Sequence, residues 1–245
     1  MPQDCKVREA MGARGSGAFR RYRAMVHGDV SPGRVLRDEC IQFFCGATPG
    51  ALGFYLRSKL YPRLFKHCGR GVVFGRNLTL RHASKISIGD GCVLDDSAML
   101  DAKGQDNRGI TLGDRVYVGR QSIVYCKNGD ITLGDRVNLS ANCVVFSSNS
   151  LTMKPGTMVG AFTYLLSGGS YDYADATPFA DQSGMVTQGP LVIGEDCWIG
   201  ARVTVLDAAS IGDRAVVGAG AVVNKPLPAR HLCVGVPARP IRPIA

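Results

Sequence analysis

The chain has 245 residues, of which 45% are hydrophobic and 20% charged, an ordinary composition for a globular protein with one sizeable core and a smaller appendage. The net charge of +9 is uneven, because residues 1–70 hold 13 Lys and Arg against 5 Asp and Glu. No basic stripe with interleaved aromatics continues beyond this segment, which argues against nucleic-acid binding, and no apolar run is long enough to span a membrane.

The N-terminal segment, residues 1–70, is predicted to be a basic, partly helical extension. We expect residues 1–15 to be disordered, and Val35–Phe44 and Ala51–Phe65 to form helices that carry basic and aromatic side chains. Such helices either pack on the rest of the protein, the interpretation we favour, or lie on an anionic membrane surface. An acidic glycan is a further candidate partner for the basic segment. Because the N-terminus lacks a signal-peptide core, we expect a cytoplasmic protein, with peripheral attachment at the inner membrane face as the membrane alternative.

From residue 86 onward the sequence repeats every six residues. An aliphatic residue opens each hexad, Gly often follows it, and a small residue stands four positions after it. This pattern predicts a short strand and a corner per hexad, with three hexads closing one triangular coil of a parallel solenoid. Cys92, Cys143 and Cys197 take the small-residue position, so we expect them to be packing residues in a reducing compartment. The residues that open successive coils are Ile88, Leu112, Leu133, Met153, Ile193 and Ile211.

The spacing between these coil openings is uneven, which indicates insertions at the corners. The longest insertion falls between Met153 and Ile193, and we expect a loop excursion over residues 166–190. Loops of this length without secondary structure of their own are usually functional. The excursion is therefore the first place to look for catalytic residues.

Several segments resemble the hexapeptide-repeat acyltransferases. The triplets Ile88-Gly89-Asp90 and Ile211-Gly212-Asp213, the segment Cys197-Trp198-Ile199-Gly200-Ala201 and the tail Val234-Gly235-Val236-Pro237-Ala238-Arg239 are typical of the sugar O-acetyltransferase branch. The resemblance covers roughly residues 71–243. It implies an all-β fold, a left-handed parallel β-helix, and a homotrimer with active sites between subunits. It also implies acetyl-CoA or another acyl-CoA as cosubstrate, no required metal, and an acceptor hydroxyl on a sugar, a polysaccharide or a related small molecule.

The resemblance also assigns binding residues. A tryptophan walls the thioester end of the cofactor, cations near the last coils face its phosphates, and glycine–alanine pairs offer free backbone N–H and C=O groups to the pantetheine arm. Asn142 matches an asparagine that holds acceptor hydroxyls, although a corner role explains it equally well, and Asp175 on the excursion is a second acceptor candidate. The cofactor set is Trp198, Gly200, Ala201, Gly218, Ala219, Lys225, Arg239 and Arg242.

The general base is the point where this chain departs from the family pattern. The resembling enzymes use a His on the excursion, and the matching position here is Tyr171, a residue type whose ordinary pKa near 10 is too high for this role. Three interpretations stay open. Asp172 or Asp175 is the base, His82 reaches the site from another coil or subunit, or the protein is a weak or inactive trimeric scaffold in a polysaccharide or natural-product pathway. Tyr171 itself either donates a hydrogen bond to the substrate or packs against a neighbouring subunit.

A metal-dependent enzyme of the same fold, the γ-carbonic anhydrase type, needs three His ligands around one ion. The chain has four His, and none of them lies between residues 83 and 230. We therefore expect no metal site.

Overall fold

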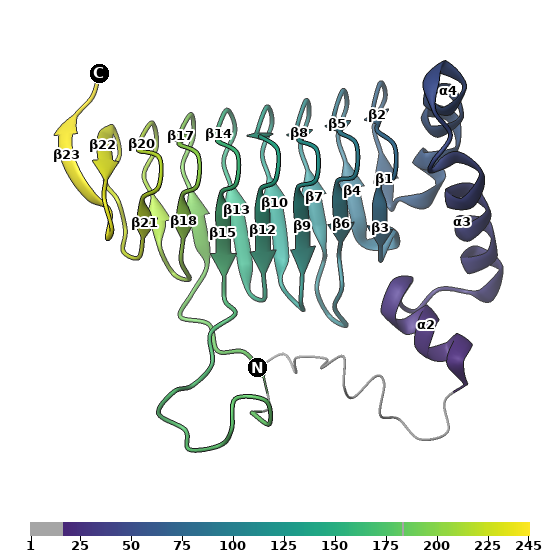
Figure 1. Ribbon diagram of the computed structural model, residues 1–245, viewed down its shortest axis with the longest axis horizontal. Helices are drawn as coiled ribbons and strands as arrows, with labels where there is room; N and C mark the ends of the chain where they lie inside the picture. Colours follow the sequence, from purple (N-terminus) through teal and green to yellow (C-terminus); the bar gives the residue numbers. More distant parts are fainter. Residues whose placement is uncertain (1–16, 183) are drawn as a thin grey trace.

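The computed structural model describes residues 17–182 and 184–245, so the disorder expected for residues 1–15 lies outside the described residues. From residue 67 the chain winds into a three-sided solenoid of parallel strands, to which each coil adds one strand per side (Figure 1). Sheet A contains β1 (His67–Cys68), β4 (Ile86–Ile88), β7 (Ile110–Leu112), β10 (Asp130–Leu133), β13 (Ser150–Met153), β16 (Leu191–Ile193) and β19 (Ser210–Ile211). Sheet B contains β2 (Val73–Phe74), β5 (Val93–Leu94), β8 (Tyr117–Val118), β11 (Asn138–Leu139), β14 (Met158–Val159), β17 (Trp198–Ile199), β20 (Val216–Val217), β22 (His231–Val234) and β23 (Arg239–Pro243). Sheet C contains β3 (Thr79–Arg81), β6 (Met99–Asp101), β9 (Ile123–Cys126), β12 (Val144–Ser147), β15 (Tyr164–Ser167), β18 (Thr204–Val205) and β21 (Val222–Val223).

The six-residue repeat coincides with the strand register. All six residues that were predicted to open coils lie in sheet A, and each pairs with the next, from Ile88 with Leu112 to Ile193 with Ile211. Their side chains are buried, so they stack along the axis of the solenoid as one aliphatic core. The prediction of a parallel β-helix with a helical N-terminal part is confirmed.

The solenoid begins one coil earlier than the repeat indicated. Cys68 pairs with Ile88, and Phe74 and Leu80 follow Cys68 at six-residue steps in β2 and β3. This first coil escaped notice because a cysteine opens it in a polar stretch, where an aliphatic residue was expected.

The small residues at the corners are buried, and the polar ones among them also connect the coils. The Sγ of Cys92 donates to the carbonyl oxygen of Gly113 at 3.0 Å, and the Oγ of Ser122 donates to that of Ser140 at 2.8 Å. Burial raises the pKa of the Cys143 thiol, which keeps it protonated and inert. The described cysteines are all free thiols, in agreement with the predicted packing role at the corners.

A line of corner aspartates joins the coils on another edge. Asp90 Oδ1 accepts the backbone N–H of Arg70 at 2.7 Å, Asp114 Oδ1 accepts that of Asp90 at 2.8 Å, and Asp135 Oδ1 accepts that of Asp114 at 2.9 Å. The N–H of Arg70 is the main reason that the pKa of Asp90 is lowered. The Gly-Asp pairs of the repeat are therefore a hydrogen-bonded ladder between coils.

In the part of the chain that the structure describes, three α-helices precede the solenoid, namely α2 (Ala18–Val26), α3 (Pro32–Cys45) and α4 (Gly50–Leu60), and the 3₁₀ helix η1 (Tyr61–Leu64) continues α4. A second 3₁₀ helix, η2 (Ala83–Lys85), lies within the first coils. Pro32 occupies the first turn of α3, and the Oγ of Ser31 accepts the N–H of Arg34 at 3.3 Å as the N-cap. The helices expected at Val35–Phe44 and Ala51–Phe65 thus fall within α3 and across α4 and η1.

Helices α3 and α4 pack against the open end of the first coil. The buried Arg57 of α4 donates from Nε to the carbonyl oxygen of Phe74 at 2.9 Å and from Nη1 to those of Cys45 and Thr48 at 3.0 and 2.8 Å. The ring of Tyr61 packs edge-on against Phe74. The helices therefore cap the solenoid, as the favoured interpretation predicted.

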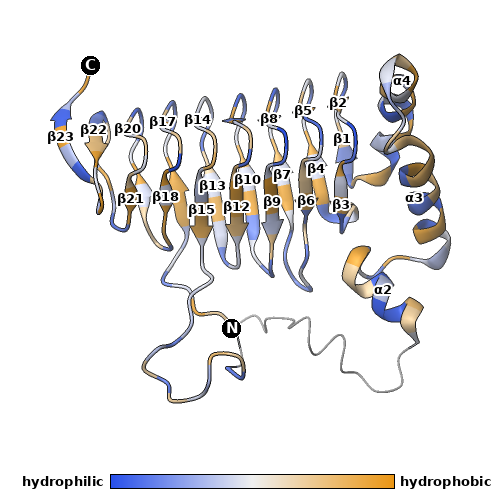
Figure 2. Ribbon diagram, in the orientation of Figure 1, coloured by the Kyte–Doolittle hydropathy of each residue, from blue (hydrophilic) through white to orange (hydrophobic). Residues whose placement is uncertain are grey.

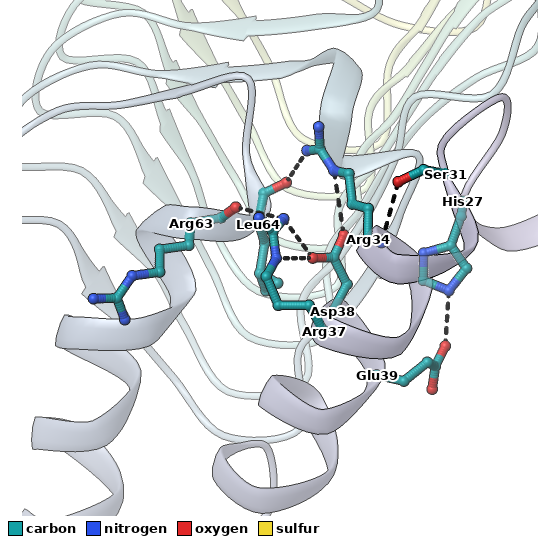
Figure 3. Close-up of polar contacts among 8 residues, drawn as sticks. All are labelled: His27, Ser31, Arg34, Arg37, Asp38, Glu39, Arg63 and Leu64. Atoms are coloured by element: carbon teal, nitrogen blue, oxygen red, sulfur yellow. Dashed lines mark hydrogen bonds and ion pairs between the residues drawn. The ribbon is translucent and has the colours of Figure 1, made fainter.

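The two acidic residues of α3 are paired with neighbouring side chains (Figure 3). Asp38 accepts from Nε and Nη2 of Arg37 at 2.9 and 2.7 Å, and the Nε of Arg34 lies 3.5 Å from its other oxygen. Glu39 Oε1 lies 2.8 Å from Nε2 of His27. The remaining charge of this end of the molecule is consequently positive.

The opposite end of the solenoid is closed by β23, which runs antiparallel to β22. This last strand carries Pro240 and Pro243, which have no N–H, and the exposed Arg239 and Arg242.

Candidate functional site

The excursion leaves the solenoid after β15 and returns at β16. Asp207 holds both stems, because its carboxylate accepts the N–H of Gly168 at 2.6 Å and that of Gln188 at 2.5 Å. Gly168 and Gly169 have φ angles of +94° and +92°, which other residues rarely adopt, so the two glycines allow the sharp exit from β15. The root of the excursion is therefore fixed to the scaffold.

The outer part of the excursion is organised around Gln182, whose side chain is buried although its neighbours are exposed. Its Oε1 accepts the N–H of Asp172 at 3.1 Å, and its Nε2 donates to the carbonyl oxygens of Asp172 and Thr177 at 2.7 and 3.2 Å. The Tyr171 ring lies 6.0 Å from that of Phe179, centroid to centroid. Tyr171 and Asp172 are thus held in place by the loop itself.

The two candidate carboxylates of the excursion are both solvent-exposed within one chain. Asp172 Oδ1 accepts the N–H of Ala174 at 2.9 Å, and Asp175 Oδ1 accepts that of Thr177 at 2.8 Å. This bond to the Thr177 backbone holds the pKa of Asp175 below its usual value, which makes Asp175 a weaker base. Of the two, Asp172 is the better candidate for a base.

His82 lies elsewhere. It follows β3 at the corner between sheets C and A, four strands of sheet C before β15, which places it ~19 Å from the excursion root along the axis. Its side chain is buried, with Nδ1 2.9 Å from Asp101 Oδ1 and Nε2 3.3 Å from the carbonyl oxygen of Ala24. It also lines a cavity of about 470 Å³ under α2, together with Arg20 and Arg23. Within one chain the structure does not bring His82 to Tyr171 or Asp172.

Asn142 occupies a corner between β11 and β12 with a φ of +58°, and its N–H donates to the carbonyl oxygen of Arg120 at 3.0 Å. Gln121 and Phe162 have the same left-handed conformation at the equivalent corners of the neighbouring coils. Asn tolerates this conformation better than most residues, so the geometry provides the corner role directly.

Most of the predicted cofactor residues lie in sheet B or at the corners that follow its strands, whereas Lys225 follows β21 of sheet C at the corner that leads to sheet A. Trp198 is 62% exposed, and it pairs in register with Val216, which pairs with Leu232, which in turn pairs with Arg242. We call this row the sheet B row. It connects the residue expected at the thioester end with a cation expected at the phosphate end.

One expectation about the cofactor backbone is wrong. The N–H groups of Gly200 and Gly218 are not free, because they donate to the carbonyl oxygens of Val217 and Cys233, both at 2.8 Å. The carbonyl oxygen of Ala201 accepts the N–H of Gly220 at 2.9 Å. These glycines instead permit close stacking of the coils, since a Cβ on Gly200 would lie 2.6 Å from the backbone nitrogen of Ala219. The hydrogen bonds between coils thus use the two glycine N–H groups and the Ala201 carbonyl oxygen that were expected to be free for the pantetheine arm.

The excursion and the sheet B row lie on different sides of the solenoid. The excursion emerges at the corner between sheets C and A, whereas sheet B is the side opposite that corner (Figure 1). A single chain therefore does not join Asp172 to Trp198 in one cleft. Among residues 17–182 and 184–245, no group of three or more His, Cys, Asp or Glu is arranged to hold a metal ion.

Sequence reasoning missed Gln182 and Asp207. Asp207 accepts from the backbone of Gly168, 39 residues away, and a contact at that separation cannot be read from the six-residue pattern. Gln182 lies on the excursion, outside the repeat, so the repeat does not mark it.

These features define a class of protein, a parallel β-helix of hexapeptide repeats with a loop excursion at one corner. Residues 190–225 match the family model for the bacterial transferase hexapeptide (six repeats), and residues 109–147 match that for the hexapeptide repeat of succinyl-transferase. Over these two segments the chain is similar to the hexapeptide-repeat acyltransferases.

Two known proteins illustrate the similarity. Galactoside O-acetyltransferase from Escherichia coli is 40% identical over 63 residues, which make up 26% of this chain and 31% of that protein. The matched region thus spans about a third of the length of this curated relative. A variant of AntD, an N-acyltransferase from Bacillus cereus in complex with dTDP and coenzyme A, shares the fold with a TM-score of 0.55 and 20% identity, covering 78% of this chain and 90% of that one.

Proposed function

We propose that the protein is an acyl-CoA-dependent O-acyltransferase that moves an acyl group, acetyl in the simplest case, to a hydroxyl of a sugar, a polysaccharide or a related small molecule. The observation that carries this proposal is the stretch of 40% identity with galactoside O-acetyltransferase, a protein named for this chemistry. The exposed sheet B row and the organised excursion supply surfaces on which such a reaction can take place.

The active form is proposed to be a homotrimer. The excursion and the sheet B row face opposite ways in one chain, so a second copy is needed to bring Asp172 of one subunit to Trp198 of another. A cyclic trimer repeats the same contact three times and closes the ring. Arg239 and Arg242, in the last strand of sheet B, would then meet the phosphates of the bound cosubstrate.

The reaction joins the acceptor oxygen to the thioester carbonyl carbon and breaks the C–S bond, so that coenzyme A leaves and takes up a proton. A base must remove the hydroxyl proton as the C–O bond forms. We assign this task to Asp172, because Gln182 fixes its backbone on both sides and its second carboxylate oxygen is available in addition to the one that caps Ala174.

Asp172→Asn tests this assignment. We expect the variant to lose at least about 100-fold in kcat with acetyl-CoA and its best sugar acceptor, because general-base catalysis contributes this much. The measurement is release of free coenzyme A over a panel of sugars. Asp181→Asn, an exposed carboxylate of the same excursion, is the matched control and should retain wild-type activity. Equal rates for the two variants would remove Asp172 from the mechanism.

The alternative, a non-catalytic scaffold, rests on the Tyr at position 171 where the family has His. It predicts that coenzyme A binds, as calorimetry would show, while no acceptor in the panel supports release of free coenzyme A. Turnover with any sugar would exclude this alternative.

A further inference from the structure

The capping helix α3 has two apolar stripes, and only one of them is covered. Val35 and Cys45 face the solenoid and are buried, whereas Leu36, Phe43 and Phe44 are exposed by 68%, 81% and 66%. The exposed residues recur at steps of seven and eight, which puts them on one side of the helix. The side chain of Phe43 packs edge-on against Phe44, with ring centroids 5.1 Å apart.

Helix α4 extends the exposed apolar surface at the same end of the molecule. Leu52, Phe54 and Tyr55 are all at least half exposed. Figures 1 and 2 show α3 and α4 outside the first coil, with hydrophobic residues along both helices. We call the exposed residues Leu36, Phe43, Phe44, Leu52, Phe54 and Tyr55 the aromatic end face. Contiguous exposed apolar surface of this kind usually marks an interaction site.

The charge around the aromatic end face is positive. Residues 32–66 contain six Lys and Arg and two Asp and Glu, and Asp38 and Glu39 are already paired with Arg37 and His27. Lys59, Arg63 and Lys66 are exposed, and Figure 3 shows the Arg63 guanidinium directed away from the Asp38 cluster. The ammonium of Lys59 lies 5.8 Å from the centroid of the Tyr55 ring, so cationic and aromatic groups alternate on this surface.

We propose that the aromatic end face docks the protein on an anionic lipid bilayer. Aromatic and aliphatic side chains enter the boundary between headgroups and acyl chains, and the surrounding cations pair with anionic headgroups. A second copy of the chain is a poorer occupant, because it would present the same positive charge. In the described residues no helix is long and apolar enough to cross a membrane, so the attachment is peripheral.

The aromatic end face lies at one end of the solenoid, and this position favours docking on a bilayer. If the protein is the cyclic trimer proposed above, with its axis along the solenoids, three copies of the face point in one direction and meet one plane. Several weak contacts with the same surface then add to a stable attachment. The docking itself does not depend on the acyltransferase activity.

Co-sedimentation of the full chain with vesicles tests the proposal. We expect binding to vesicles of phosphatidylcholine mixed with phosphatidylglycerol, weaker binding to phosphatidylcholine alone, and a decrease with added salt. The double variant F43S/F44S should bind the mixed vesicles at least about tenfold less, since two large apolar side chains no longer enter the bilayer. The control is Ile241→Ser, which removes a similarly exposed apolar side chain at the opposite end of the solenoid and should leave binding unchanged.

A second arm distinguishes lipid from a second copy of the chain. Light scattering should give the same oligomeric mass for the wild type and for F43S/F44S, and acyl transfer to a soluble sugar should be the same in both. The proposal would be overturned if the wild-type protein bound neither kind of vesicle. It would also be overturned if the F43S/F44S assembly dissociated, because the aromatic end face would then be a subunit interface. Loss of lipid binding with intact acyl transfer leaves the proposed function standing, whereas absence of turnover in both proteins counts against that function alone.

Discussion

At the scale of single residues, the Gln182 side chain holds the backbone of the excursion at Asp172. One amide side chain bonds to both backbone groups of Asp172, and it is buried where the residues around it are exposed. A buried amide with satisfied donors and acceptors fixes a loop more firmly than the short-range turns at Asp172 and Asp175 do alone. Gln182 therefore fixes the backbone from which the Asp172 carboxylate extends.

Tyr171 is expected to serve as a packing residue of the excursion. Its ring contacts Phe179 and does not need the hydroxyl for that contact. Tyr171→Phe should therefore keep kcat within about tenfold of the wild type, whereas loss of more than about 100-fold would show a direct role for the hydroxyl.

Tyr171→His restores the residue type found in the resembling enzymes and should raise the rate of acyl transfer, measured as release of coenzyme A over the acceptor panel. No gain with any acceptor would contradict the alignment of Tyr171 with the family His.

The candidate site was predictable from sequence only where side chains follow the repeat or a family motif. Trp198 and Arg242 were assigned to opposite ends of the cofactor by the resemblance, and the structure puts them in one register row of sheet B. His82 could not be placed, because its burial depends on α2 and Asp101, which no local pattern connects. The prediction that the N–H groups of Gly200 and Gly218 are free was wrong for a similar reason. These groups bond to the neighbouring coil, which the local sequence does not show.

At the scale of elements, the excursion combines an irregular path with a rigid root. The glycine exit after β15 and the carboxylate of Asp207 join the two stems, and Val186 pairs with Ser170 in an isolated antiparallel bridge. Such a root permits an exposed loop to keep one shape while a subunit docks against it.

Asp207→Ala should loosen this loop without unfolding the solenoid. The variant loses two hydrogen bonds from backbone N–H groups to a charged acceptor, each worth roughly 1.5–3 kcal/mol. We expect limited proteolysis within residues 168–190 to become at least about tenfold faster, with the thermal unfolding temperature nearly unchanged because the excursion lies outside the aliphatic core. Asp181→Ala is the control, and equal cleavage of both variants would refute the clamp.

The elements themselves were largely predictable. Each side of the triangular coil takes one inward-pointing aliphatic side chain, which gives the six-residue spacing. The residues predicted to open the coils therefore all fall in sheet A and pair with one another. The first coil was missed because Cys68 replaces the aliphatic residue, although Phe74 and Leu80 keep the spacing. The hydrogen bonds from corner thiols and hydroxyls were not expected either, since small size explained those residues without them.

At the scale of the whole molecule, the aspartate ladder makes stability depend on pH. The N–H of Arg70 and that of Glu195 are the main causes of the lowered pKa of Asp90 and of Asp213. A carboxylate with a lowered pKa in the folded state stabilises the protein above its unfolded value, about 3.9, and this contribution is lost as the pH falls through the folded value.

We expect the free energy of unfolding to decrease below about pH 4, as measured by urea denaturation across a pH series. Asp90→Asn should flatten this decrease, because the amide accepts the same N–H without titrating. A wild-type protein whose stability is constant from neutral pH to pH 3 would contradict the role of the ladder.

The two ends of the solenoid differ from its middle in one respect that affects how the protein behaves in concentrated solution. A stack of parallel strands has unpaired backbone at its first and last coil, and bare edges of this kind recruit further chains into fibres. Here α3 and α4 cover one end, where Arg57 donates to the carbonyl oxygen of Phe74, and a strand with two prolines and two arginines turns back across the other end. Both ends of the solenoid are thus protected against the addition of further strands lengthwise.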